Sequence, residues 1–311
     1  MQPGIVEVAA AVIERPDGSF LLAQRPAGKV YAGWWEFPGG KIARGETPEA
    51  ALERELREEL GIQVQRAYPW ITRVHAYEHA TVMLWFFRVV AWCGEPAARE
   101  GQQLAWQRLG APMAAPMLPA NAPVLAALAL PLEYAITDAQ ALGAAEQLAR
   151  VEARMKGGLR LVQVRDREHW ERARLIYVVR RMAQQYGAKV LVSGGPAADG
   201  IHYTAAALMA LRARPREAAG LLAAASCHSV EELGHAMAVG MDLAVLGPVK
   251  ATSTHPDAPT LGWDGFRRIA EGASIPVYAI GGLKPEDLDQ ARRAGAHGLA
   301  MITGSWSAAP R

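Results

Sequence analysis

Residues 40–62 read GKIARGETPEAALERELREELGI, and this stretch decides the fold of the first part of the chain. It predicts a helix from Pro48 to Leu60. Thr47 is a good N-cap, Pro48 suits the first helical position, and Gly61 is typical of the residue at which a helix ends. The apolar positions of this helix are Leu52, Leu56 and Leu60, which form one stripe that would face a core.

Three glutamates of the same helix, Glu55, Glu58 and Glu59, are spaced three and four residues apart and therefore share one flank. Carboxylates so close together repel one another unless a cation neutralises them. Oxygen-rich clusters of this kind suit Mg²⁺ or Mn²⁺, which also bridge phosphate oxygens. A solvated surface helix is the alternative interpretation, because Arg54 and Glu58 form a favourable i,i+4 pair.

The spacing around the helix favours the metal-binding interpretation. The pattern is Gly, five residues, Glu, seven residues, then Arg-Glu-aliphatic-x-Glu-Glu-x-Gly-aliphatic, and residues 40–62 fill its nine specified positions without a gap. The stretch resembles the Nudix box. Four further segments extend the resemblance to the MutT type of Nudix enzyme, the 8-oxo-dGTP diphosphatases: residues 35–41 (WEFPGGK), 94–96 (GEP), 99–102 (REGQ) and 118–121 (LPAN).

This resemblance implies metal-dependent hydrolysis of 8-oxo-dGTP at the β-phosphorus, which yields 8-oxo-dGMP and pyrophosphate. The implied metal is Mg²⁺, with Mn²⁺ as a substitute. The implied metal ligands are Gly39, Glu55, Glu58, Glu59 and Glu100, and the four glutamates are also the implied catalytic residues. Of these, Glu55 or Glu100 would take the proton of the attacking water. The implied base-pocket residues are Arg25, Phe37 and Asn121.

Asn121 also has a chemical argument of its own. Guanine presents two acceptors, N7 and O6, on one edge. Oxidation at C8 places a proton on N7, so the edge then presents a donor and an acceptor. A single amide side chain offers both groups in return, and it therefore matches the oxidised base and mismatches the normal one. A turn residue between prolines is the alternative for Asn121, and a plain surface arginine is the alternative for Arg25.

The middle of the chain, Ala111 to Pro131, is rich in Ala and Pro and predicts an extended linker with one short helix at residues 122–130. The boundary is placed near Leu132, which gives domains of residues 1–131 and 132–311. The first domain has expected strands at residues 5–13, 20–24, 67–77 and 81–92. With the helix they predict an α+β pattern, a mixed sheet that the resemblance identifies as the Nudix α/β/α sandwich.

After the boundary, strands and helices alternate. The expected strands cover residues 134–137, 159–165, 190–193, 200–203, 220–225, 243–246, 277–280 and 298–302. Eight strands that alternate with helices predict an α/β fold, a (β/α)₈ barrel of the TIM type. Only residues 194–199 separate the third and fourth strands, too few for a crossover helix, so the barrel is expected to lack one helix.

Several segments of the second domain resemble thiamine-phosphate synthases and the related thiazole tautomerases over about residues 132–306. They are residues 134–138 (YAITD), 162–166 (VQVRD), 226–229 (SCHS), 247–248, 252–259 and 279–283 (AIGGL). In such barrels the loops after strands seven and eight hold phosphate. The candidate phosphate or ligand residues are Gln163, Arg165, His228, Thr252, Thr254, Gly281, Gly282 and Thr303.

Synthase activity is not expected of this barrel. Synthases of the family carry an Asn-Asp pair after the third strand and Gln-x-Asp after the fourth, which bind Mg²⁺ and diphosphate. Here those stretches read SGGP at residues 193–196 and TAAA at 204–207, and Arg167 and His255 replace the usual lysines. His228 matches a tautomerase-type histidine and suits a general base near neutral pH. A packed or capping histidine is the alternative.

Composition limits the partners. The hydrophobic fraction of 51% and charged fraction of 21% are typical of a soluble globular enzyme. A net charge of +2 disfavours a nucleic-acid polymer. Two distant cysteines predict a reducing, cytoplasmic setting. Neither a signal peptide nor a membrane span of about 20 apolar residues is expected. The expected partner is a small nucleotide, and a homo-oligomer is compatible with the sequence.

Three hypotheses follow from the sequence. The first is a nucleotide-pool sanitising hydrolase that carries a degenerate synthase-like barrel. The second is a pyrophosphohydrolase of thiamine-pathway pyrophosphates, which the fusion itself suggests. In the third, the barrel is a non-catalytic module for ligand binding or assembly.

Overall fold

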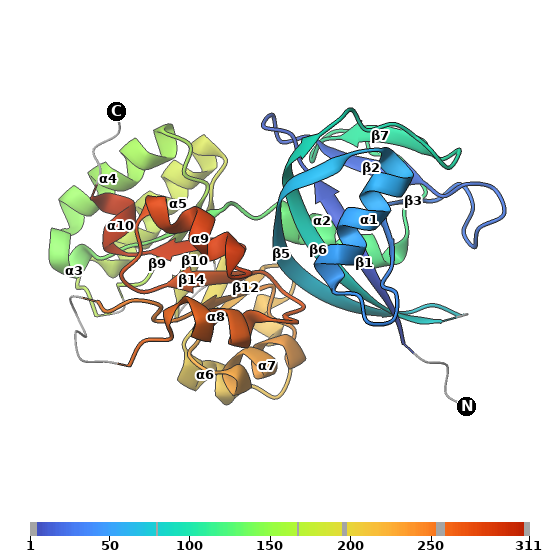
Figure 1. Cartoon of the computed structure of the whole chain (residues 1–311). Coiled ribbons are helices and arrows are strands. Elements are labelled where there is room, and N and C mark those ends of the chain that lie inside the picture. The colour runs from blue at the N-terminus through green and yellow to red at the C-terminus, as the bar shows by residue number, and fades with distance from the viewer. Residues whose placement is uncertain (1–4, 79, 167, 195–197, 253–258, 308–311) are drawn as a thin grey trace. The chain divides into compact units, whose positions relative to one another are not determined.

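The computed structural model describes residues 5–78, 80–166, 168–194, 198–252 and 259–307 (Figure 1). The chain divides into two compact units, Met1–Ala129 and Leu130–Arg311. No helix in the described part of the chain is both long and apolar enough to cross a membrane.

The N-terminal unit is a mixed β-structure with helices on both faces. Its strands are β1 (Val6–Ile13), β2 (Phe20–Gln24), β3 (Trp35–Glu36), β4 (Gly39–Lys41), β5 (Gln63–Ala76), β6 (Thr81–Cys93) and β7 (Gln103–Gln107). Its helices are α1 (Pro48–Leu60), the 3₁₀ turn η1 (Pro119–Asn121) and α2 (Ala122–Leu128). Four strands pair in the order β4-β1-β6-β5 and three in the order β3-β2-β7. β1 and β6 are parallel, whereas the other pairs are antiparallel, so the mixed sheet is confirmed.

Strand β1 is buried on both faces, and this alternation sets the layers of the unit. Ala9, Ala11 and Ile13 pack with the leucine stripe of α1. Ala10 and Val12 face the other way and pack with α2. Because successive strand residues point to opposite faces, one strand lies between the two helices. Figure 1 shows α1 and α2 on either side of β1 and β6. The α/β/α sandwich predicted from the sequence is confirmed.

Helix α1 has the bounds and caps that its sequence predicts. Thr47 accepts a hydrogen bond from the Ala50 N–H at its N-terminus. Gly61 ends the helix at φ 70° and donates to the Arg57 carbonyl. The apolar stripe of Leu52, Leu56 and Leu60 is buried. The opposite flank, which carries the glutamates, is therefore held at the edge of the core.

The Ala/Pro-rich segment before the boundary is not a linker, contrary to the expectation from composition. Leu118, Val124 and Ala127 are buried in the core on the α2 face. The Leu118 N–H also donates to the Trp35 carbonyl at 3.0 Å, which fixes the segment beside β3. The segment packs against the unit and does not form an extended tether, because enough apolar side chains lie between its prolines to be buried. Helix α2 also ends two residues before the predicted end.

The C-terminal unit is a closed, all-parallel barrel, which confirms the predicted TIM-type fold. Its strands are β8 (Glu133–Ile136), β9 (Leu161–Val164), β10 (Lys189–Ser193), β11 (Gly200–Tyr203), β12 (Leu222–Cys227), β13 (Leu243–Leu246), β14 (Val277–Ile280) and β15 (Gly298–Met301). The surrounding helices are α3 (Ala139–Leu142), α4 (Ala144–Lys156), α5 (Arg172–Tyr186), α6 (Ala205–Met209), α7 (Val230–Ala238), α8 (Gly262–Ala270), α9 (Leu288–Arg293) and α10 (Thr303–Trp306). Two 3₁₀ turns, η2 (Arg216–Ala218) and η3 (Pro285–Asp287), complete the set.

The expected loss of one helix is also seen. β10 and β11 are parallel neighbours in the barrel, and only residues 194–199 join them. The described residues of this connection contain no helix. The barrel interior is filled by side chains that include Tyr134, Tyr278 and Leu243, as TIM-type barrels require.

Candidate active site

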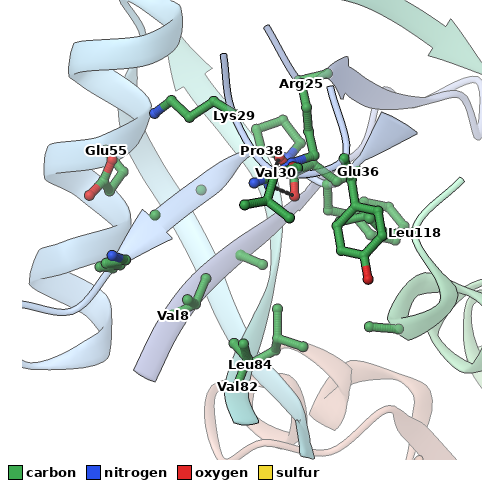
Figure 2. A pocket seen from close by; sticks show the side chains of 18 of the residues that line it. Val8, Arg25, Lys29, Val30, Glu36, Pro38, Glu55, Val82, Leu84 and Leu118 are labelled. Carbon is green, nitrogen blue, oxygen red and sulfur yellow. Dashed lines mark hydrogen bonds and ion pairs between the residues drawn. The ribbon is translucent and has the colours of Figure 1, made fainter. Parts of the chain in front are cut away.

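A pocket of about 690 Å³ lies in the N-terminal unit (Figure 2). Figure 2 shows Glu55 on the α1 side of this pocket and Leu118 on the opposite side. Seven of the residues that the sequence singles out line it together: Arg25, Phe37, Gly39, Glu55, Glu59, Glu100 and Asn121. Glu58 is not among the lining residues. Its side chain is 58% exposed and pairs with Arg54 at 3.3 Å.

Arg54 joins helix α1 to the loop that precedes it. Its guanidinium donates to both carboxylate oxygens of Glu46, at 3.0 and 2.9 Å, and to the Lys41 carbonyl at 3.0 Å. It also donates to Glu55 at 2.7 Å. Glu46 accepts the Ala43 N–H as well, so its carboxylate closes the loop. The spacing of Glu46 and Arg54 in the Nudix pattern is therefore explained by the ion pair that they form in the fold.

Two adjacent glycines of β4 allow two close approaches, Gly40 to helix α1 and Gly39 to strand β1. A Cβ atom on Gly40 would lie 2.1 Å from the Glu55 carboxyl carbon. A Cβ on Gly39 would lie 2.1 Å from the Ala9 carbonyl oxygen, and Gly39 also has a φ of 145°. Only glycine adopts such a backbone without strain. The close approach of backbone to carboxylate at Gly40 holds Glu55 at the edge of the pocket.

The carboxylates of the pocket repel one another. Burial, and after it the neighbouring charges of Glu100 and Glu55, together raise the pKa of Glu59 to about 7. The donors here are carboxylate oxygens, which are the ligands that hard divalent cations prefer. Among the described side chains, these groups do not converge into a cluster of three or more metal-ligating residues, and Glu55 is paired with Arg54 instead. The donor set fits a divalent cation, which would relieve the repulsion.

Arg25 is held by the structure on its own side of the pocket. Its Nη1 donates to both carboxylate oxygens of Glu36, at 2.7 and 2.8 Å, and its Nε donates to the Val30 carbonyl at 2.6 Å (Figure 2). These bonds tie the loop of residues 26–34 to β3. Burial raises the pKa of Glu36, while the charge of Arg25 opposes that shift. Arg25 thus fixes a partly buried carboxylate beside the pocket.

Aromatic and apolar side chains line the pocket together with the amide of Asn121. Phe37 lies edge-on to Phe86, with ring centroids 5.8 Å apart. Asn121 is 3% exposed and donates from Nδ2 to the Trp35 carbonyl at 3.4 Å. An amide side chain can form about four hydrogen bonds, so the bond to Trp35 leaves capacity for a ligand. The arrangement suits an aromatic ring with a polar edge.

The barrel candidates lie at or after the carboxyl ends of their strands. Gln163 on β9 is buried and donates to Ser193 Oγ at 2.6 Å, and its Oε1 has no partner among the described residues. Arg165 pairs with Asp138 at 3.4 Å. His228 is exposed after β12, and its Nδ1 lies 2.6 Å from the Gly247 carbonyl oxygen. Thr252 is described, Thr303 begins α10, and Thr254 lies outside the described residues.

The glycines after β14 have a packing reason of their own. A Cβ on Gly281 would lie 2.6 Å from Pro248, and a Cβ on Gly282 would lie 2.4 Å from the Ala251 carbonyl oxygen. Both glycines have positive φ, 107° and 60°. They therefore permit the loop after β13 to pack on the loop after β14. Their predicted role in phosphate binding stays a prediction.

Comparison with known proteins assigns both units. The NUDIX domain family matches residues 9–127, and the thiamine monophosphate synthase family matches residues 133–304. The chain belongs to both families. The Nudix unit is 41% identical over 125 residues to the 8-oxo-dGTP diphosphatase of Haemophilus influenzae, a match that covers 40% of this chain and 92% of that protein. It is also 41% identical over 123 residues to the CTP pyrophosphohydrolase of Escherichia coli, covering 40% and 90%. The synthase-like unit is 31% identical over 184 residues to the thiamine-phosphate synthase of Caldivirga maquilingensis, covering 55% and 86%.

Sequence reasoning missed several polar residues of the Nudix pocket, among them Glu36 and Gln102. Glu36 lines it within the quoted WEFPGGK segment, and its pairing with Arg25 is the contact that could have drawn attention to it. Gln102 lines it at the end of the quoted REGQ segment. Both residues lie next to named candidates in sequence. The only feature of the sequence that marked them was their position within a motif. Such a position does not reveal the contacts that the fold creates.

We expect Gly40→Ala to destabilise the Nudix unit and to lower its activity, since the added Cβ meets the Glu55 carboxylate. Glu55→Ala removes that carboxylate, so in the Glu55→Ala background Gly40→Ala should cost little stability. Thermal unfolding of the two single variants and the double variant measures this coupling. Equal losses in the two backgrounds would show that the carboxylate is not what Gly40 accommodates.

Proposed function

We propose that the Nudix unit hydrolyses 8-oxo-dGTP to 8-oxo-dGMP and pyrophosphate with Mg²⁺, and so removes an oxidised nucleotide from the precursor pool. The observation that supports this proposal is a buried amide, Asn121, that lines the same pocket as Glu55, Glu59 and Glu100. The pocket therefore offers an amide that suits recognition of a base, and carboxylates that suit the metal ion bound to a polyphosphate. Its volume of about 690 Å³ lies within the range of small-ligand sites.

The residues fit a mechanism of hydrolysis at phosphorus. Glu55, Glu59 and Glu100 would hold Mg²⁺ together with Glu58, and the backbone at Gly39 would supply a further ligand. When bound, Mg²⁺ polarises phosphoryl oxygens and lowers the pKa of water. Glu55 or Glu100 would accept the proton of the attacking water. Arg54 orients the Glu55 carboxylate through its 2.7 Å bond, and Phe37 would pack against the base.

Glu55→Gln tests the catalytic assignment. The variant should lower kcat by several orders of magnitude and leave the fold intact, because it removes one anionic oxygen from the pocket and leaves the buried stripe of Leu52, Leu56 and Leu60 unchanged. Steady-state hydrolysis with Mg²⁺ measures the effect. A loss of less than about tenfold, or about 1.4 kcal/mol of barrier, would contradict a catalytic role for Glu55.

Asn121→Ala tests base recognition. The Asn121 carbonyl would accept N7–H of 8-oxoguanine and its amide would donate to O6, whereas normal guanine would oppose two acceptors. Loss of such a bond costs roughly 1–3 kcal/mol. The ratio of kcat/KM for 8-oxo-dGTP to that for dGTP should therefore fall by about tenfold or more. If kcat/KM falls by the same factor for both nucleotides, Asn121 is a structural turn residue.

Other pyrophosphates are the competing substrates. One relative of equal identity is named for CTP, and the fused barrel belongs to a family named for thiamine monophosphate. A profile of the purified full chain against 8-oxo-dGTP, dGTP, CTP and thiamine diphosphate separates these alternatives by kcat/KM. The proposal requires 8-oxo-dGTP to rank first. A higher kcat/KM for CTP or for thiamine diphosphate would replace it.

The barrel is proposed to be either a ligand-binding module or a tautomerase that uses His228, and not a synthase. The stretch at residues 204–207 contains no carboxylate, and Thr204 is used as the N-cap of α6, accepting the Ala207 N–H. The buried Asp166 accepts from the Ala139 N–H at 2.7 Å and from Thr137, so its carboxylate is committed to the fold. Calorimetry with thiazole phosphate and thiamine phosphate would distinguish binding from a scaffold.

We therefore expect the full chain to form no thiamine phosphate from thiazole phosphate and a pyrimidine diphosphate. The reason is that carboxylates for metal diphosphate are missing from the sequence at residues 193–196 and 204–207. Product analysis with Mg²⁺, beside an active synthase as a positive control, measures this. Formation at a rate near that of the control would overturn the expectation.

A further inference from the structure

The segment that carries Glu100 is fastened to the end of α1. The last carbonyls of a helix have no partner within the helix. Here the Ala97 N–H donates to the Leu60 carbonyl at 3.0 Å, and the Arg99 N–H donates to the Glu59 carbonyl at 3.1 Å. Residues 97–102 thus complete the C-terminus of the helix that bears the other glutamates. This contact brings Glu100 near them although it lies some forty residues further along the chain.

One buried side chain closes the contact. Gln102, which is 7% exposed, accepts the Glu100 N–H on Oε1 at 2.8 Å. Its Nε2 donates to the Glu59 carbonyl at 3.0 Å. The two ends of a single amide therefore join the backbones of Glu100 and Glu59. Among side chains of this length, a neutral amide alone offers a donor and an acceptor together.

We propose that Gln102 is a positioning residue that sets the separation of the Glu59 and Glu100 carboxylates and thereby the affinity of the pocket for a divalent cation. The inference rests on the proposed function, in which these glutamates hold Mg²⁺. Gln102 lines the pocket with both glutamates, but its polar atoms are used by the two backbone groups. It acts through Glu59 and Glu100, not on the substrate.

The neighbouring amide provides a matched control. Gln103 is exposed at the start of β7, whereas Gln102 is buried. Gln102→Met keeps the length of the side chain and removes both hydrogen bonds, and Gln102→Ala serves as a second variant. Gln103→Met makes the same chemical change one residue away, on the surface. Differences between the two positions therefore report the bonds that Gln102 makes.

The test is Mn²⁺ binding to the full chain without nucleotide, followed by electron paramagnetic resonance. Residues that orient metal ligands typically contribute 10–100-fold to metal affinity. Gln102→Met and Gln102→Ala should raise the Kd for Mn²⁺ by about tenfold or more, and Gln103→Met should leave it unchanged. Thermal unfolding of the metal-free proteins checks folding. A lower Tm with an unchanged Kd would overturn the proposal and make Gln102 a packing residue.

A second pair of variants separates this inference from the proposed function. Glu59→Gln and Glu100→Gln should each weaken Mn²⁺ binding if the pocket holds the metal. If neither does so, the metal assignment of the proposed function is wrong, and the inference is wrong with it. If both weaken binding while the Gln102 variants do not, the metal assignment holds and the inference about Gln102 alone is overturned.

Discussion

The ion pairs of Arg54 are the interaction on which the Nudix site depends. A single guanidinium binds the Glu46 carboxylate, the Lys41 carbonyl and the Glu55 carboxylate. An exposed ion pair alone is worth about 1 kcal/mol or less. Here one cation joins a loop, a strand end and a helix, and the geometry of the network restricts each of them. Gly40 lies against this network, since a Cβ there would meet the Glu55 carboxylate, whereas a Cβ at Gly39 would meet the Ala9 backbone on β1.

A buried apolar stripe explains why a charged helix remains part of a folded core. Leu52, Leu56 and Leu60 anchor α1 against β1, and full burial of one such side chain stabilises the fold by about 1.5–3 kcal/mol. The opposing flank collects carboxylates, and burial, followed by the charges of Glu100 and Glu55, raises the pKa of Glu59, so its ionised form disfavours the fold. The apolar stripe offsets this effect in the metal-free chain. A helix that is held by its core places the side chains of a binding site more precisely than a loop does.

The sequence predicted what local spacing determines. Helix α1 was predicted to the residue, because its cap, its first proline, its final glycine and its leucine period all agree. The short strands β3, β4 and β7 were not predicted. Two or three residues carry no period, and these strands exist only through pairing with β1 and β2. The Ala/Pro-rich segment was misread for a related reason, since its composition does not reveal the backbone bond to Trp35 that fixes it beside β3.

Contacts between distant segments explain the remainder of the site. Asn121 and Glu100 were named from motifs, but Glu36 and Gln102 acquire their interest only from the Arg25 and Glu59 groups that face them. Residue identity tells which bonds a side chain is able to make, and only the fold tells which of them are made. A motif therefore identifies the groups that do chemistry more readily than the groups that hold them.

The two units differ in how closely fold and chemistry are joined. In the Nudix unit the residues that close the loop on α1 also carry the site, so loss of Arg54 or Gly40 would disturb both. In the barrel, the interior is filled by Tyr134, Tyr278 and their apolar neighbours. The packing of these side chains does not depend on the loops at the carboxyl ends of the strands. The closed sheet therefore does not dictate which side chains follow the strands. Family membership fixes the architecture of such a barrel and leaves its activity to the side chains at its rim.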